Sequence, residues 1–186
     1  MVERFRSLKI ILLGEKEIGK SSFRQVFIKN ARINYVMSIP VDFALVEKEI
    51  VHQNENMSVT IQIWDFIKLE YAHLKECPPH QSFLKSTNAG IIVFDVSNIE
   101  SFQKIAPYIS LLFEVNKAVL PIYVVGTKAD LRESTTCVST SEISELISKL
   151  EKEYPDANIK YSETSIFSQS VEKDVENIFN SLLSSI

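Results

Sequence analysis

The sequence predicts an α/β fold in which helices cover both faces of a mostly parallel, six-stranded sheet. Short apolar runs, of the kind that form buried parallel strands, alternate along the chain with segments of helical periodicity. Two consecutive strands are separated only by a polar turn, so a single hairpin interrupts this alternation. The chain has 186 residues, of which 45% are hydrophobic, and we expect residues 1–186 to form one domain.

The first half of the chain opens with an apolar run that stops at Gly14. Apolar residues then recur at helical spacing, and a later segment alternates apolar and polar residues as a half-buried strand does. The expected elements are a strand at 8–13, a helix at 20–29, and strands at 43–53 and 57–64 with a turn at 54–56.

The second half contains two fully apolar runs and three helical segments. Pro107 should kink or split the first of these helices, and Ser139 with Glu142 forms a capping box ahead of the second. The expected elements are strands at 90–96, 122–125 and 159–161, and helices at 100–117, 143–153 and 171–183.

Ligands of open parallel sheets bind beyond the carboxyl ends of the strands. In this chain those ends are Gly14, Asp65, Asp95 and the segment 126–130. We therefore look for function at these positions.

Residues 14–21 match the phosphate-loop pattern Gly-x-x-x-x-Gly-Lys-Ser/Thr between a strand and a helix. Backbone N–H groups of such a loop and the positive end of the helix dipole bind phosphate oxygens. Lys20 would reach the outer phosphates, and Ser21 would hold Mg²⁺. The chain has only four glycines, so a chance match is rare. Nucleotide contacts in this loop are assigned to Gly14, Glu17, Ile18, Gly19, Lys20, Ser21 and Ser22.

The apolar strand at 122–125 leads into Gly-Thr-Lys-Ala-Asp, which ends at Asp130. The carboxylate of Asp130 can accept hydrogen bonds from N1–H and the 2-amino group of guanine, which adenine cannot supply. This segment resembles the Asn/Thr-Lys-x-Asp element of small GTPases, and residues 163–165 resemble the start of their Glu-Thr-Ser-Ala-Lys element. The resemblance implies base contacts from Thr127, Lys128, Asp130, Ser165 and the backbone N–H of Ile166.

The resemblance extends over most of the chain. Trp64-Asp65, the segment 38–43 and the segment 90–97 are similar to the corresponding segments of Rab proteins. The chain is therefore identified as a Ras-superfamily small GTPase, nearest to Rab. This resemblance implies a phosphate-loop G domain with GTP or GDP and Mg²⁺ as ligands. It also implies protein effectors, and exchange or activating factors, that bind through the switch I and switch II segments.

Switch I departs from the family pattern. Ser38 stands where a threonine binds Mg²⁺ and the γ-phosphate, and it keeps the hydroxyl. Tyr35 fits the usual switch I tyrosine, whereas Pro40 replaces a glycine. The aromatic residue that normally stacks on guanine is missing, so either Arg32 stacks on the base or nothing does.

Switch II departs further. Asp65 is kept, and the resemblance implies that it holds Mg²⁺ through water. Lys68, however, stands at the usual glycine and Leu69 at the usual glutamine. Leu69 cannot orient the attacking water, so no catalytic side chain is intact. Lys68 and Lys16 would both stabilise bound GTP. As an alternative, Lys16 would act as a built-in cationic finger that assists hydrolysis. Two prolines near residue 78 should end the switch II helix early.

Two functions of different classes remain open. One is a slow GTP/GDP-dependent switch in vesicle trafficking or signalling, and the other is a GTP-locked or inactive binding scaffold. A phosphate-loop kinase is a third alternative, but the segment from Thr127 to Asp130 favours guanine.

The net charge of −4 gives no electrostatic reason to expect nucleic acid as a partner. No apolar run is long enough to cross a membrane, and no cysteine for lipidation stands near the last residue. We therefore expect a cytoplasmic protein that reaches membranes only through a partner or an absent tail. The two cysteines are far apart in the sequence, which fits a reducing compartment.

Overall fold

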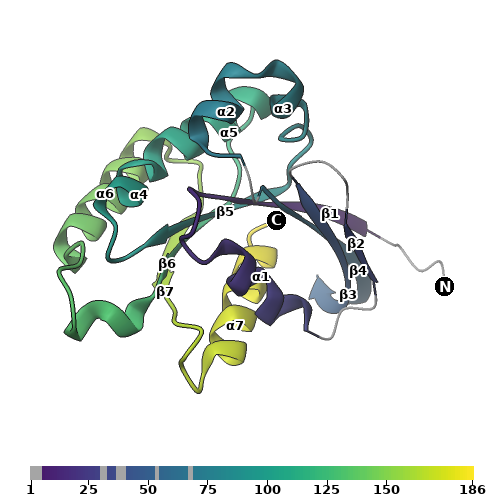
Figure 1. Ribbon diagram of the computed structural model, residues 1–186. Coiled ribbons are helices and arrows are strands. Elements are labelled where there is room, and N and C mark those ends of the chain that lie inside the picture. Colours follow the sequence, from purple (N-terminus) through teal and green to yellow (C-terminus); the bar gives the residue numbers. More distant parts are fainter. Residues whose placement is uncertain (1–5, 30–32, 37–40, 53–54, 67–68) are drawn as a thin grey trace.

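The computed structural model describes residues 6–29, 33–36, 41–52, 55–66 and 69–186. One sheet with the strand order β2-β3-β4-β1-β5-β6-β7 forms its centre (Figure 1). The strands are β1 (Arg6–Leu13), β2 (Ile33–Val36), β3 (Asp42–His52), β4 (Glu55–Asp65), β5 (Ala89–Asp95), β6 (Ile122–Thr127) and β7 (Ile159–Glu163). The predicted fold class is confirmed, and β2 is a short edge strand in addition to the six predicted ones.

The sheet is parallel from β4 through β1, β5 and β6 to β7, whereas β2 and β3 run antiparallel to their neighbours. The hairpin of β3 and β4 is tighter than predicted. Glu55 and Asn56, which we placed in the turn, pair with His52 and Val51. Only two positions, 53 and 54, therefore lie between the last paired residues, His52 and Glu55.

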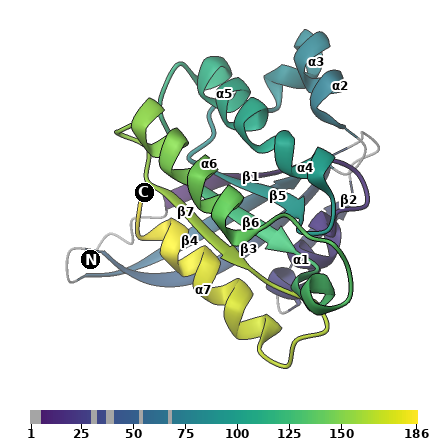
Figure 2. The same ribbon diagram turned by 90° about the vertical axis from the view of Figure 1, so that its left-hand side faces the viewer.

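Helices cover both faces of the sheet, as predicted (Figures 1 and 2). The helices are α1 (Lys20–Ile28), α2 (Tyr71–Glu76), α3 (Pro78–Ser82), α4 (Ile99–Gln103), α5 (Ile105–Asn116), α6 (Thr140–Glu153) and α7 (Val171–Leu183), with a 3₁₀ turn η1 at Ala129–Glu133. Helices α1 and α7 lie on one face, and α4, α5 and α6 lie on the other.

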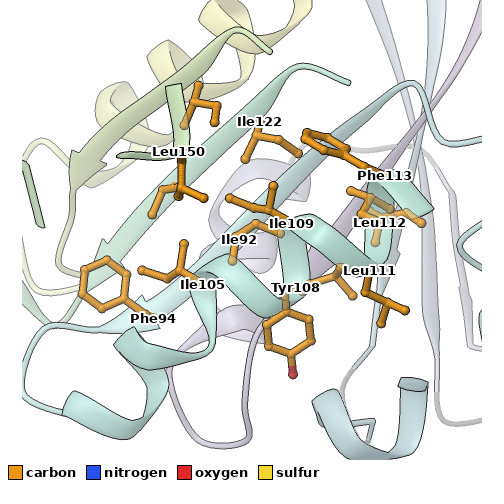
Figure 3. Packing of buried hydrophobic residues seen from close by; sticks show 14 of the residues in the cluster. Ile92, Phe94, Ile105, Tyr108, Ile109, Leu111, Leu112, Phe113, Ile122 and Leu150 are labelled. Atoms are coloured by element: carbon orange, nitrogen blue, oxygen red, sulfur yellow. The ribbon is translucent and has the colours of Figure 1, made fainter. Parts of the chain in front are cut away.

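Each face of the sheet has its own apolar core. In β1, Ile11 and Leu13 belong to the core beneath α5 and α6, while Ile10 and Leu12 belong to the core beneath α1 and α7. Figure 3 shows the first core, in which side chains of α5 pack onto β5 and β6. A strand buried on both faces has no polar alternation, which is why residues 10–13 of β1 and 89–94 of β5 read as continuous apolar runs.

Local signals set several helix ends. The predicted helix at 100–117 is split at Lys104, and Pro107 lies in the first turn of α5, where its missing N–H leaves no bond unmade. Pro78 opens α3 directly after α2 ends, as the two prolines predicted. None of the helices in the described part of the chain is long and apolar enough to cross a membrane.

The capping box of α6 is confirmed. The Glu142 N–H donates to Ser139 Oγ at 3.2 Å, and the Ser139 N–H donates to Glu142 Oε2 at 2.9 Å. Two backbone donors at the helix start are thereby satisfied.

Candidate functional site

The phosphate loop connects β1 to α1, and both of its glycines have positive φ. Gly14 has a φ of +147°, and a Cβ there would lie 2.3 Å from the carbonyl oxygen of Val93. Gly19 has a φ of +95° and caps the start of α1. Glu17 also adopts a left-handed conformation, with a φ of 60°. Backbone geometry therefore favours glycine at both positions, because other residues rarely adopt these φ values.

Lys20 lies inside this loop and is almost completely buried. Its ammonium group donates a 2.7 Å hydrogen bond to the carbonyl oxygen of Gly14 and another to that of Glu15. Burial lowers the pKa of Lys20, while nearby carboxylates oppose the shift. A bound anion would replace part of the lost hydration of this cation, so the position suits a phosphate ligand.

A cavity of about 350 Å³ extends from the phosphate loop to the end of β6, within the usual size range of ligand pockets. It is lined by Glu17, Gly19, Lys20, Ser21, Ser22, Phe23, Thr127, Lys128, Asp130, Thr164, Ile166, Phe167, Val171 and Val175. Most of the described residues that the sequence assigns to nucleotide contacts thus meet around one hollow.

At the metal end, Ser21 Oγ donates a 3.1 Å hydrogen bond to Asp65 Oδ2. Asp65 is fully buried at the end of β4, and burial raises the pKa of its carboxyl group while Arg24 and Lys20 oppose the shift. Its second oxygen, Oδ1, has no hydrogen-bond partner among the described residues. A hydroxyl beside a buried carboxylate with a spare oxygen is a donor set that fits Mg²⁺ or its bound water.

At the base end, Asp130 in η1 accepts a hydrogen bond from the Ser165 hydroxyl. The backbone N–H of Phe167 donates to the same hydroxyl at 3.1 Å, which fixes the loop that carries Ile166. Phe167 and Ile166 are among the most exposed large apolar side chains of the described chain. They border the cavity beside Asp130, where the flat face of a base would need apolar cover.

Thr127 and Lys128 connect this end to the rest of the site. The Thr127 hydroxyl bonds the carbonyl oxygen of Phe94 at 2.9 Å and also that of Ile18 in the phosphate loop. Lys128 lines the cavity, and its Nζ lies 2.6 Å from Asp95 Oδ2. Burial alone would raise the pKa of Asp95, but hydrogen bonds from Lys128 and Ser97 hold this pKa below its ordinary value.

The side chain of Ile18 is buried in the apolar core, so only its backbone faces the site. Tyr35 lies in β2 opposite Phe43, and its side chain falls outside the description. Ser38 and Lys68 lie outside the described residues, as do Arg32 and Pro40, so their assigned roles stay predictions.

Leu69 and Glu70, just before α2, both contact other parts of the protein. Leu69 is only 5% exposed and packs in the same apolar core as Phe66 and Leu74. Lys16 Nζ lies 3.3 Å from Glu70 Oε2, so the phosphate loop and the start of α2 form an ion pair. Leu69 therefore points into the core and away from solvent, which the sequence did not indicate.

Three supporting residues were missed in the sequence. Arg24 on α1 binds Asp42 and Asp65, and Glu15 binds the backbone of α2 and a side chain of α5. Arg132 pairs with Glu163 through two nitrogens, one at 2.6 Å, and so ties η1 to β7. Only the position of Arg24, three residues after Ser21 on one helix face, gave a signal that could have been read.

The comparisons with known proteins agree with this geometry. A profile of the Ras family matches residues 9–186. The GTP-binding protein ypt4 of Schizosaccharomyces pombe is 29% identical over 180 residues, which cover 96% of this chain and 71% of that protein. Ras-related protein RabL of Dictyostelium discoideum is 26% identical over 166 residues, covering 89% of this chain and 78% of that protein. The Ras and EF-hand domain-containing protein of Xenopus tropicalis is 30% identical over 142 residues, which are 73% of this chain but only 19% of that protein. The chain therefore belongs to the Ras family and is a Rab-like small GTPase.

Proposed function

We propose that the chain binds GTP and GDP with Mg²⁺ and acts as a molecular switch with slow intrinsic hydrolysis. The observation that carries this proposal is the cavity that joins the two halves of the predicted nucleotide site. Lys20 and Ser21 line its phosphate end, and Asp130 and Ile166 line its base end. One extended ligand with phosphates at one end and a purine at the other matches this arrangement.

Selection of guanine would depend on Asp130. Its carboxylate has only acceptor oxygens, and the Ser165 hydroxyl holds one of them in place. Guanine presents two donors on the edge that would face this group, whereas adenine presents an acceptor at N1. Adenine would therefore bring two acceptors together and lose affinity.

Mg²⁺, when bound, would supply positive charge beside the phosphate oxygens. Ser21 and Asp65 are the described residues that would hold it, with Ser38 assigned from the sequence. The spare Asp65 oxygen supports this assignment because a buried carboxylate oxygen without a partner is unfavourable.

Slow hydrolysis is supported by the place of Leu69. In the family a glutamine at this position orients the attacking water, whereas Leu69 has no polar side-chain atom and lies in the core. Phosphoryl transfer in these proteins depends on positioning and on charge stabilisation, so an unpositioned water reacts slowly.

The alternative is a scaffold that binds partners without turnover. The ion pair of Lys16 with Glu70 favours this alternative, because the ion pair holds the start of α2 without a γ-phosphate. The mass of nucleotide released from freshly purified protein distinguishes these functions. GDP would support the cycling switch, GTP would support a locked scaffold, and an empty site would support a scaffold without nucleotide and contradict the proposed switch.

The Rab-like character supports a role in vesicle trafficking or signalling in the cytoplasm. Effectors, and exchange or activating factors, would bind the switch I and switch II segments. Within this proposal, residues 1–186 work as one G domain.

A further inference from the structure

Arg24 forms a buried ionic cluster next to the predicted metal position. Arg24 is 8% exposed and lies on α1, one helical turn beyond Ser21. The guanidinium Nη2 is 2.7 Å from Asp42 Oδ2, and its Nε is 3.3 Å from Asp65 Oδ2. A guanidinium group stays charged at every pH at which proteins fold, so a fixed cation sits beside both carboxylates.

The two carboxylates come from neighbouring strands. Asp42 begins β3 and Asp65 ends β4, and the two residues are direct partners in the antiparallel register. Like charges opposite each other in a sheet repel, and the repulsion is stronger where the groups are buried. Arg24 offsets this repulsion, which explains why two acidic residues are tolerated at this point.

The same cluster changes what Asp65 can offer to a metal. Asp65 Oδ2 already accepts a hydrogen bond from the Ser21 hydroxyl and forms an ion pair with the Arg24 guanidinium. A divalent cation near this oxygen would be repelled by Arg24 and would share the carboxylate with it. Without the metal, Asp65 would still have a cationic partner and would repel bound phosphates less.

We propose that Arg24 is a built-in counter-cation of Asp65 that makes nucleotide retention by this chain only weakly dependent on Mg²⁺. The inference rests on the proposed function, because it assumes a guanine nucleotide with Mg²⁺ in the cavity. It assigns Arg24 as a positioning and charge-balancing residue that touches Asp65 and not the nucleotide.

The test measures release of fluorescently labelled GDP from preloaded protein into excess unlabelled GDP, in Mg²⁺ and in EDTA. The measured quantity is the ratio of the two release rates. In the parent, the release rate in EDTA divided by that in Mg²⁺ should stay below about ten. In Arg24→Gln this ratio should rise at least about tenfold, because a charge interaction worth one pKa unit corresponds to a factor of about ten. Arg24→Lys keeps the charge and should keep the ratio close to that of the parent.

Arg24→Gln leaves Asp42 and Asp65 facing each other without the guanidinium that pairs with both, so it carries a risk of unfolding. The double variant Arg24→Gln with Asp42→Asn removes one charge of each sign and should show the same raised ratio. Asp42→Asn alone is the matched control, because it disturbs the cluster but leaves Arg24 beside Asp65, and its ratio should stay low.

An equal ratio in the parent and in the double variant would overturn the role of Arg24, and so would a parent ratio well above about ten. A parent that takes up no labelled GDP in either buffer would overturn the proposed function itself, and the inference with it. A purely structural role for Arg24 would change the melting temperature of the variants but not the ratio of release rates.

Discussion

The hydroxyl of Tyr108 donates a 2.8 Å hydrogen bond to Glu15 Oε1, which joins α5 to the phosphate loop. The backbone N–H of Tyr71, the first residue of α2, points at the same oxygen from 3.3 Å. The rings of Tyr71 and Tyr108 meet edge to face, 5.5 Å apart. One carboxylate therefore connects the phosphate loop, the switch II helix and the core, and the hydroxyl of Tyr108 points out of the apolar cluster to reach it (Figure 3).

Replacing Tyr108 by Phe should weaken this connection. The variant keeps the ring packing but removes a hydrogen bond to a carboxylate, so the free energy of unfolding should fall by about 2 kcal/mol. Urea denaturation measures the change. Tyr123→Phe is the control, because Tyr123 is also buried but its hydroxyl has no hydrogen bond among the described residues, and it should cost far less. Equal losses in the two variants would show that the Glu15 contact contributes nothing.

Leu69→Gln, the change that restores the family residue, should destabilise the protein. The side chain is 5% exposed and belongs to an apolar core, so a buried amide there should cost about 1–3 kcal/mol. Leu69→Met nearly conserves volume and should cost less than about 1.5 kcal/mol. Thermal and urea denaturation of the two variants provide the comparison. A fully stable Leu69→Gln would mean that the residue can turn out of the core.

The ion pair of Arg132 and Glu163 should make part of the stability depend on pH. Burial would raise the pKa of Glu163, but the hydrogen bonds from Arg132 and Tyr161 hold it below its ordinary value of 4.5. As the pH falls, Glu163 therefore takes up a proton in the unfolded chain before it does so in the folded protein. The stability that this pair contributes is complete above about pH 5 and is lost as the pH falls through the lower pKa of the folded state.

Glu163→Gln should consequently lower the free energy of unfolding by about 1 kcal/mol at pH 7, and the difference from the parent should shrink below pH 4.5. Glu145→Gln, at an exposed position, is the control and should show no such difference. A gap between parent and Glu163→Gln that stays constant from pH 7 to pH 3 would contradict the assigned pKa direction.

Intrinsic GTP hydrolysis should be at or below about 10⁻⁴ per second, the rate of unassisted Ras with its glutamine intact. Single-turnover hydrolysis of preloaded GTP measures this rate. Lys16 is the residue that could raise it, but its Nζ is engaged with Glu70. Lys16→Ala should therefore leave the rate unchanged within about twofold. A parent rate above about 10⁻² per second, the order reached with a built-in arginine finger, would contradict the slow switch.

The parts of the site that could be predicted from sequence are those in which spacing along the chain fixes the geometry. The phosphate loop from Gly14 to Ser21 is one such segment, since its strand, turn and helix are continuous. The same holds for the capping box of α6. The short strand β2 was missed because four residues carry too little periodicity to be recognised.

The contacts that hold the site together could not be predicted, because they join distant positions. Glu15 and Tyr108 are 93 positions apart, and Arg24 and Asp42 are 18 apart across a helix and a strand. The burial of Leu69 was missed for a related reason. The resemblance assigned it the place of the glutamine that orients the attacking water, whereas Leu69 is buried in the apolar core that also contains Phe66 and Leu74.

Selection of guanine by Asp130 is tested by the affinities of the purified protein for GDP and for ADP in Mg²⁺. The Asp130→Asn variant is measured in parallel. We expect the parent to bind GDP at least about a hundredfold more tightly than ADP, because Asp130 rejects a base without two facing donors. Asp130→Asn should lose affinity for GDP and gain affinity for xanthosine diphosphate, whose carbonyl group needs a donor opposite it. Equal affinities of the parent for GDP and ADP, or an Asp130→Asn variant with unchanged preference, would contradict the account.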